Sequence, residues 1–487
     1  MVFHSLEFLV FFGVVAICYF AAPLRARWIV LLAASLYFYG ASEPVFLMQI
    51  LAATGLCYWL ALRLSATENQ SNKKRLLTFG IVLLVANLVA FKYSELFNET
   101  LRAMFGWAGA HYPVPTFQVW LPIGISFYTF QLISYLVDVY RGGVPERHLG
   151  LFAVYVTFFP KVIAGPIERA KNLLPQLHLE HRLDYAQAVN GLQLMLWGAF
   201  KKVVVADRIA PFVSSVYDNP TAHDGVEMAF ATWLYAFQIY FDFSGYTDIA
   251  LGAALILGFK LSPNFNRPYI ATSISDFWKR WHISLTSWLT DYVYTPFTRQ
   301  RRIKMKFYNL MLLGLFITFV VSGFWHGAQW TFVAWGMLHG LYIVVSLQTQ
   351  KVRTAFSKRV GLLARPKLHR VIKIFVTFNL VSFAYILFRA NSFGDAIYII
   401  QHLLTGWSRA PWTIKEFVYD GFAEFTLAAA GIVLIMWAES WKTKIDLPAL
   451  LARRPVLRWS MYYAGALSIV LLGAFYGMNQ QFIYFRF

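Results

Sequence analysis

Long apolar runs separated by short polar segments alternate along nearly the whole chain. A bilayer-spanning helix needs about 20 mostly apolar residues, and the longer runs meet that requirement. With the shorter, broken runs added, the pattern predicts an all-α integral membrane protein with about 11 to 13 transmembrane or re-entrant helices. The clear runs begin near Leu6, Val45, Leu76, Phe152, Leu192, Val226, Leu310, Thr331, Val371, Phe425 and Met461.

The composition agrees with this fold class. Of the 487 residues, 58% are hydrophobic and 14% are charged, and the mean hydropathy is +0.52. In soluble domains about a quarter of all residues are charged. The first apolar run has no basic residue before it and is followed by many similar runs, so we expect a retained span rather than a signal peptide. Cys18 and Cys57 both lie in apolar runs, where they offer neither a disulfide framework nor a zinc site.

The net charge of +19 comes from basic residues in short segments between the apolar runs. Basic short loops of membrane proteins face the cytoplasm, and this rule places the amino terminus on the extracytoplasmic side. Anionic lipid headgroups account for the charge, so no nucleic-acid partner is expected. The main clusters are Arg25 with Arg27, and residues 73–75, 299–306, 351–370 and 453–458.

Residues 1–487 show no linker, repeat or composition break, so we predict a single membrane domain. Its central region, about 121–340, sets polar and ionisable residues among apolar ones, which is costly in a membrane and marks function. Early in this region, the proline and glycine of "LPIGIS" loosen a helix. Further on, Lys161 lies between two prolines in "FFPKVIAGPIERA", which favours a span that ends at the cytoplasmic face.

Two carboxylates, Asp242 and Asp248, lie in the apolar run "YFDFSGYTDIALG". On a regular helix they face different directions, and Gly245 between them permits a break. Acid–base chemistry is one interpretation of the pair. A structural role, either pairing with an arginine or capping a broken helix, is favoured.

The stretch "DFWKRWHISLTSWL" predicts an amphipathic helix in the membrane interface, with tryptophans at headgroup level. Asp276 and Arg280 have the spacing of an ion pair along one helix. His282 is either a catalytic residue or one more interfacial polar group. The residues that recur on the apolar face are Phe277, Trp281, Leu285 and Trp288.

His326 is the sharpest single candidate in the chain. In "TFVVSGFWHGAQWTFVAW" the apolar run breaks at Ser322 and Gly323, presents Trp325 and His326, and then resumes. A histidine between two half-spans lies near membrane depth, where an imidazole needs a partner or a water-filled cavity. The pattern leaves two roles open, catalysis or a buried structural histidine bonded to a carbonyl.

Several separate blocks, in order along the chain, resemble the membrane-bound O-acyltransferase family, and within it the bacterial branch that acetylates polysaccharides. The blocks are "LPIGISFYTFQ", "AGPIER", "YFDFSGYTDIALG", "NFNRPY", "DFWKRWHISLTSWL" and "GFWHGAQWTFVAWG". The resemblance implies a ring-shaped helix bundle with a central funnel, in the bacterial inner membrane. One departure concerns the polymer, because "DYVY" is followed here by "TPFTRQRRIKMKF" where alginate-acetylating members have a Gly-Gly loop.

The resemblance also implies roles for individual residues. His326 would be the catalytic histidine and His282 the second functional position. Acetyl-CoA is the expected acyl donor, with no bound cofactor and no metal. A separate extracytoplasmic acetyltransferase, similar to serine hydrolases, is the expected partner, and a polysaccharide is the final acceptor. Candidate substrate-binding positions in the same blocks are Asp242, Asp276, Arg280, Trp325 and Asn266, while His339 is a candidate support for the site.

The chain ends in the aromatic stretch "FIYFRF", residues 482–487. It resembles a terminal motif of polymer-acylating systems, which implies that Tyr484 accepts the acyl group. A phenol has a pKa near 10, so it needs a neighbouring base such as an imidazole before it attacks a thioester. The simpler interpretation is an aromatic anchor in the membrane interface.

Other functions remain possible from the sequence. A transporter also uses broken helices and charges at the membrane midplane. A lipid O-acyltransferase would use a long-chain acyl-CoA, and a structural export scaffold would leave His326 without a task. Within polysaccharide acetylation, alginate-like exopolysaccharide is favoured, and peptidoglycan and cellulose are the alternatives.

Overall fold

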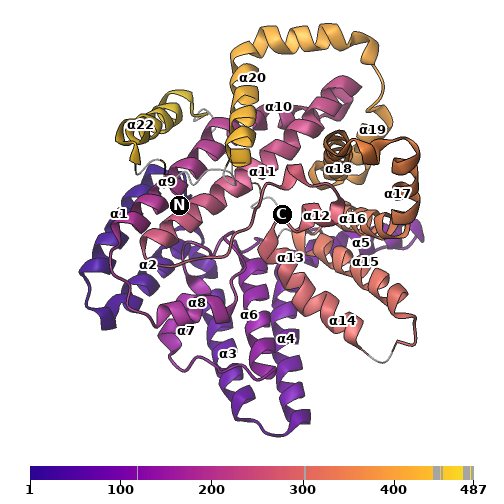
Figure 1. The fold of residues 1–487 in the computed structure, drawn as a ribbon. Coiled ribbons are helices and arrows are strands. Elements are labelled where there is room, and N and C mark those ends of the chain that lie inside the picture. The colour runs from indigo at the N-terminus through magenta and orange to yellow at the C-terminus, as the bar shows by residue number, and fades with distance from the viewer. Residues whose placement is uncertain (118, 301–302, 442–449, 451–452, 475–482, 484–487) are drawn as a thin grey trace. The chain divides into compact units, whose positions relative to one another are not determined.

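The computed structural model describes residues 1–487 except 118, 301–302, 442–449, 451–452, 475–482 and 484–487 (Figure 1). The described residues form helices and no strand, which confirms the all-α prediction. They divide into two compact units, each described by itself below. The first contains residues 1–195 and 246–263, and the second contains residues 196–245 and 264–487. The expectation of one functional domain stays a prediction.

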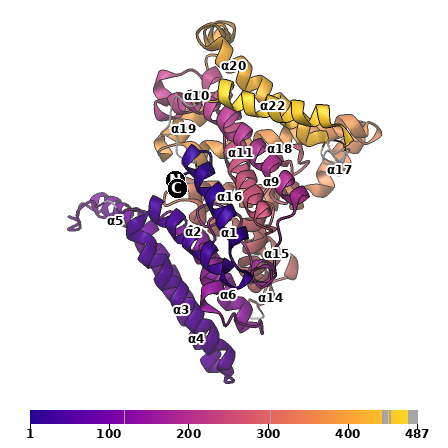
Figure 2. The same ribbon diagram turned by 90° about the vertical axis from the view of Figure 1, so that its left-hand side faces the viewer.

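The first unit is a bundle of helices from the amino-terminal part of the chain. Side-chain caps fix two of its helix starts, because the Ser5 hydroxyl accepts from the Phe8 N–H and the Asn69 side chain accepts from the Ser71 N–H. Its helices are α1 (Leu6–Ala21), α2 (Arg27–Ser42), α3 (Leu47–Ala66), α4 (Gln70–Lys92), α5 (Ser94–Trp107), α6 (Ile125–Tyr140), α7 (Leu149–Thr157), α8 (Ala170–Leu177) and most of α9 (Tyr185–Ala199). Figure 2 shows α3 and α4 side by side, and α6 packs on both.

Gly124 explains the loosened start of α6 that the sequence predicts. Its φ of 78° lies in the left-handed region, and a Cβ atom there would lie 2.5 Å from the carbonyl oxygen of Val162. Only glycine meets both conditions without strain. The glycine therefore lets the segment around Lys161 pack directly against the first turn of α6.

The sequence favours a span that ends at the cytoplasmic face near Lys161, and this stays a prediction. Lys161 is buried at 3% exposure, and its Nζ donates to the Gln131 side-chain oxygen at 2.5 Å and to the Val156 carbonyl at 3.2 Å. Glu168, also buried, accepts hydrogen bonds from the backbone and hydroxyl of Ser262. A buried charge needs such partners, and the sequence around Lys161 gives no local sign of them.

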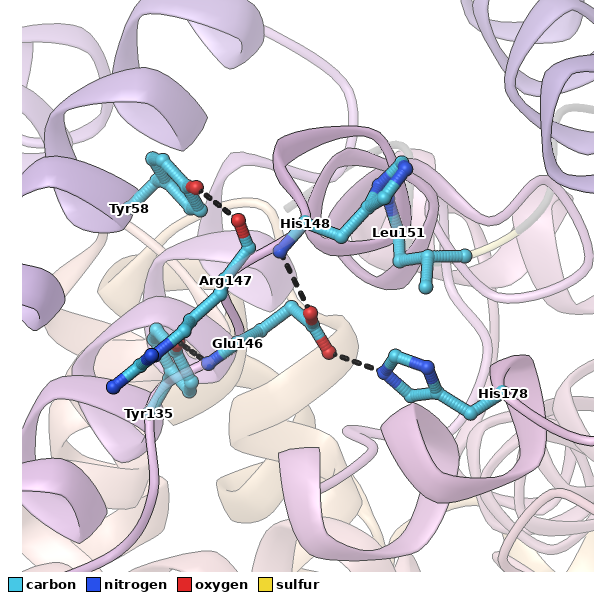
Figure 3. Close-up of polar contacts among 7 residues, drawn as sticks. All are labelled: Tyr58, Tyr135, Glu146, Arg147, His148, Leu151 and His178. Atoms are coloured by element: carbon cyan, nitrogen blue, oxygen red, sulfur yellow. Dashed lines mark hydrogen bonds and ion pairs between the residues drawn. The ribbon is translucent and has the colours of Figure 1, made fainter.

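Figure 3 shows a polar cluster at the surface of the first unit. Its hydrogen bonds hold the loop directly before α7 in place. The Glu146 carboxylate accepts from the His148 N–H at 2.8 Å and contacts His178 Nε2 at 2.6 Å. Tyr135 accepts from the Glu146 N–H at 2.9 Å, and Tyr58 donates to the Arg147 carbonyl at 2.5 Å. Within the described residues no group of His, Cys, Asp and Glu side chains has the geometry of a metal site.

The second unit contains the two candidate histidines. Its core gathers buried aromatic and aliphatic side chains between Phe200 and Phe388, together with Ile483. The helices are the π-helical η3 (Phe200–Ala206), α10 (Asp207–Asp218), α11 (Gly225–Ile256) up to residue 245, α12 (Ile274–Trp278), α13 (Ile283–Leu289), η6 (Thr290–Tyr294), α14 (Thr295–Arg299), α15 (Phe307–His326), α16 (Trp330–Gln348), α17 (Gln350–Arg359), α18 (Pro366–Arg389), α19 (Phe393–His402), α20 (Ala410–Trp441) and α22 (Pro455–Leu472).

Helix α11 is continuous through Gly245, so the break that the sequence permits there is absent. A Cβ atom on Gly245 would lie 2.6 Å from the Gly198 carbonyl oxygen, which means that the glycine serves close packing of two backbones. Asp242 belongs to the second unit and Asp248 to the first.

Seven helices in the described part of the chain are long and apolar enough to cross a membrane. This number supports the predicted multi-span membrane protein. The ring and funnel stay predictions. The seven cover Pro44–Ala66, Gln70–Lys92, Phe307–His326, Trp330–Gln348, Pro366–Arg389, Ala423–Trp441 and Pro455–Leu472.

Candidate functional site

The segment that carries His282 is not the single amphipathic helix that the sequence predicts. Helix α12 ends at Trp278, α13 begins at Ile283, and His282 has a φ of 44° in the left-handed region. Residues other than glycine adopt this conformation rarely, and such positions cluster at functional sites. The predicted interfacial side chains are buried in the core, with Phe277, Trp281, Leu285 and Trp288 each at most 4% exposed.

Asn264 fixes the turn that presents His282. Its carbonyl accepts from the Ile283 N–H at 2.9 Å, and its side-chain oxygen accepts from the Ser284 hydroxyl at 2.6 Å. The Asn266 N–H donates to the Arg280 carbonyl at 2.9 Å. These bonds join the segment "NFNR" to both sides of His282, so the backbone position of the histidine is determined from two directions. The sequence drew attention to Asn266, whereas Asn264 is the more deeply buried of the two asparagines.

His326 is the last residue of α15, and the chain turns through residues 327–329 into α16. The predicted break at Ser322 and Gly323 is wrong, because α15 continues through both residues. The histidine thus lies at the tip of a hairpin of two helices that are each long enough to span, and not between two half-spans. Gly323 packs against the partner helix instead of ending its own.

Two glycines allow the hairpin to close. A Cβ atom on Gly336 of α16 would lie 2.3 Å from the Phe319 carbonyl oxygen, and one on Gly323 of α15 would lie 2.4 Å from the Phe332 carbonyl oxygen. Small residues allow this close backbone approach between membrane helices. The contact fixes the direction in which α15 delivers His326.

Gly336→Ala is therefore expected to lower stability by about 1 to 3 kcal/mol, because the added methyl group forces the helices apart. The measurement is the apparent melting temperature in detergent. Gly55→Ala in α3 is the matched control, since a Cβ atom at Gly55 meets nothing within 4 Å. Equal melting temperatures for the two variants would contradict the tight-hairpin interpretation.

The hairpin and the α12–α13 turn bring His326 and His282 together in a buried aromatic enclosure. Their ring centroids lie 6.4 Å apart, and the residues are 3% and 0% exposed. The Trp325 ring lies beside both, 5.0 Å from the His326 ring and 5.7 Å from the His282 ring. The ring of Trp335 is 4.9 Å from that of His326. Two imidazoles at this separation can act on the two sides of one reacting group, within a space from which most water is excluded.

His339 supports the enclosure from one turn further along α16. Its Nδ1 accepts from the Trp278 indole N–H at 3.2 Å, and its ring lies 4.9 Å from that of Trp335. The bond joins α12 to α16, the two helices next to the candidate histidines. The supporting role suggested for His339 stays a prediction.

Asp276, Arg280 and Asn266 form a polar cluster of their own. The predicted i,i+4 pair is present, with Arg280 Nε 2.7 Å from Asp276 Oδ1, and Arg280 also donates to the Asn266 carbonyl at 3.3 Å. Burial alone would raise the pKa of the Asp276 carboxyl, but the Thr272 N–H and the Arg280 guanidinium hold that pKa below its usual value. This cluster braces the turn before His282, and the proposed contacts with substrate stay a prediction.

Asp242 is part of a buried ion cluster around two adjacent lysines of η3. Lys202 Nζ lies 2.7 Å from both Asp242 and Asp207, and Lys201 Nζ lies 3.2 Å from Glu439. The sequence favours an arginine partner or a helix cap for Asp242, whereas in the structure its ion-pair partner is a lysine. The lysines escaped notice in the sequence because a lysine pair beside an apolar run resembles an ordinary span end.

Tyr484 lies outside the described residues. The residue before it in the sequence, Ile483, is described and is 7% exposed. Its N–H donates to Asp242 Oδ2 at 2.8 Å, a contact between residues 241 positions apart in the chain. No local pattern in the sequence could have indicated this contact.

Comparison with known proteins bears on the chemistry of this site. Residues 148–388 match the family model of the membrane-bound O-acyltransferase family. The chain is 37% identical over 422 residues to a probable alginate O-acetylase of Azotobacter vinelandii, covering 85% of this chain and 80% of the relative. It is 33% identical over 408 residues to the peptidoglycan O-acetyltransferase of Helicobacter pylori, covering 77% and 73%. It is 29% identical over 287 residues to the teichoic acid D-alanyltransferase of Streptococcus thermophilus, covering 55% and 68%.

Proposed function

The chain belongs to the membrane-bound O-acyltransferase family, and from this premise we propose that it moves acetyl groups from cytoplasmic acetyl-CoA to an extracytoplasmic polysaccharide. Membership makes the chain an acyltransferase, so a transporter or a structural scaffold is no longer needed to explain its broken helices and buried charges. The membrane is the bacterial inner membrane, with the amino terminus on the extracytoplasmic side.

One observation carries the proposal more than any other. His326 and His282 come from separate segments of the chain and meet inside one aromatic enclosure, with 6.4 Å between their ring centroids. Burying two imidazoles costs free energy that a purely apolar core would avoid. Acyl transfer does need a base that takes a proton and then returns it.

The proposed reaction begins at the Tyr484 phenol. His326 takes the phenol proton as the oxygen attacks the thioester carbonyl of acetyl-CoA, and the carbon–sulfur bond breaks. The same proton then passes from the imidazolium to the departing thiolate. Acetyl-CoA and tyrosine become CoA and acetyltyrosine, with atoms and charge balanced. His282 orients the donor or the phenol, and basic residues at the cytoplasmic face meet the phosphates of CoA.

The acetyl group then leaves the tyrosyl ester on the extracytoplasmic side. A separate acetyltransferase, of the kind that uses a serine nucleophile, carries it to a hydroxyl of the polymer. An alginate-like exopolysaccharide is favoured because the relative from Azotobacter, at 37% identity, is named for alginate. Peptidoglycan is the second candidate, on the strength of the Helicobacter relative at 33% identity.

Purified protein supplied with labelled acetyl-CoA and, in parallel, with a long-chain acyl-CoA tests the donor. We expect CoA release and protein labelling with the acetyl donor, and little of either with the long-chain donor. The reverse preference would favour a lipid O-acyltransferase. Acetyl content of alginate-like polymer and of peptidoglycan, compared between cells with and without the protein, identifies the polymer.

A further inference from the structure

The main chain of Ile483 is bound inside the core of the second unit. Its N–H donates to Asp242 Oδ2 at 2.8 Å, and its side chain belongs to the same buried apolar cluster as Tyr240, Phe388 and Trp335. A hydrogen bond to a charged acceptor is stronger than one between neutral groups. The contact therefore fixes a point of the chain four residues before Phe487.

Asp242 is itself held rigidly. Its Oδ1 faces the Lys202 Nζ at 2.7 Å, while its Oδ2 accepts the Ile483 N–H, so the two oxygens have separate tasks. Lys202 also pairs with Asp207 at 2.7 Å, and both Lys202 and Asp242 are 4% exposed. Separating a buried ion pair is strongly destabilising because it leaves a buried charge without its partner. The Asp242 carboxylate is therefore kept in one orientation.

A cavity lies beside this contact, and one of its lining residues, Phe388, also touches the candidate catalytic histidine. The cavity has a volume of about 160 Å³, and Ile483, Asp242 and Lys202 line it together with Phe332 and Phe388. The Phe388 ring lies 5.3 Å from the His326 ring. The bound main chain and the histidine enclosure thus share a wall within one unit.

We propose that Asp242, oriented by Lys202, is a positioning residue that holds the Ile483 main chain in the second unit, and that acylation of Tyr484 depends on this contact. This inference rests on the proposed function for the role of Tyr484, but the holding of the backbone stands on the contacts alone. It replaces the substrate-binding role suggested for Asp242 from the sequence. Because the bond is made to an N–H, it fixes where the segment lies without depending on the side chain at position 483.

The first test removes the donor and keeps the carboxylate. Ile483→Pro has no backbone N–H, whereas Ile483→Val keeps it along with a branched apolar side chain. In full-length protein supplied with acetyl-CoA, we expect acetylation of Tyr484 to be at least about tenfold slower in Ile483→Pro than in Ile483→Val. Equal rates in the two variants would overturn the proposal.

The second test follows the backbone directly by hydrogen exchange of the carboxyl-terminal peptide, without acetyl-CoA. The Ile483 amide should exchange at least about tenfold faster in Asp242→Ala than in the wild type. Asp242→Asn keeps an oxygen acceptor and should restore part of the protection, which a purely structural loss would not do. The same exchange rate in the wild type and in Asp242→Ala would overturn the proposal.

The two tests separate this inference from the proposed function. If the Ile483 amide exchanges slowly in the wild type and quickly in Asp242→Ala, the holding contact is supported even when Tyr484 carries no acetyl group. If Tyr484 is acetylated but the Ile483 amide exchanges at the same rate in the wild type and in Asp242→Ala, the tyrosyl ester is supported and the positioning role is overturned.

Discussion

His326→Ala is expected to abolish acetyl transfer, with a fall of at least about 10²-fold in the rate of CoA release. The physical reason is that a phenol is almost fully protonated near neutral pH, and the imidazole of His326 is the base proposed to take its proton. The enclosure formed by Trp325 and Trp335 remains in this variant, so donor and acceptor can still meet. CoA release is measured with a thiol reagent on purified protein.

His111→Ala is the matched control, because His111 is an exposed histidine of the first unit. It should keep the wild-type rate, and both variants should elute as the wild-type protein does on size exclusion. A His326→Ala protein that is well folded and still releases CoA at the rate of His111→Ala would remove His326 from the catalytic role. His282 would then be the next candidate for the base.

Tyr484→Phe is expected to abolish the covalent step altogether. The substitution keeps the aromatic ring, and with it any anchoring of the terminal segment, but removes the oxygen that would carry the acetyl group. Polymer acetylation in cells and protein labelling in vitro should both fall to background. The readouts are polymer-bound acetate and label retained on the purified protein.

Tyr463→Phe is the control for nonspecific labelling, since Tyr463 is 63% exposed on α22. It should leave both readouts unchanged. If Tyr484→Phe supports normal polymer acetylation, the terminal stretch is an aromatic anchor, and the acetyl group passes directly from the donor to the partner enzyme.

The sequence predicted the membrane helices well because length and continuous apolarity directly determine what can span a bilayer. The Asp276–Arg280 pair was equally predictable, since it depends only on helical spacing. The pairing of His326 with His282 came from resemblance to a family, and neither spacing nor composition could have placed the two rings in one enclosure.

Helix breaks were the least predictable feature. Glycine was taken as a sign of interruption at Gly245 and Gly323, yet both helices continue, and the glycines serve contacts with other backbones. The real break, between Trp278 and Ile283, falls in a stretch with perfect helical spacing. It is imposed by bonds from Asn264, which a local pattern does not contain.

Long-range polar contacts were missed for a similar reason. The Asp242–Ile483 bond joins residues 241 positions apart, and the role of Lys202 depends on which carboxylates its helix meets. The aromatic tail was a visible signal in the sequence, because apolar residues at a chain end usually have something to pack against. What Ile483 packs against could be learned only from the folded chain.

The central claim is that an acetyl group passes through Tyr484 with the help of His326. Its most direct test is the mass of the carboxyl-terminal peptide after wild-type and His326→Ala proteins have been incubated with acetyl-CoA and quenched rapidly. We predict a gain of roughly 42 Da on Tyr484 in the wild type, and no gain in the variant. A wild-type peptide without the added mass, from protein that still releases CoA, would contradict the account.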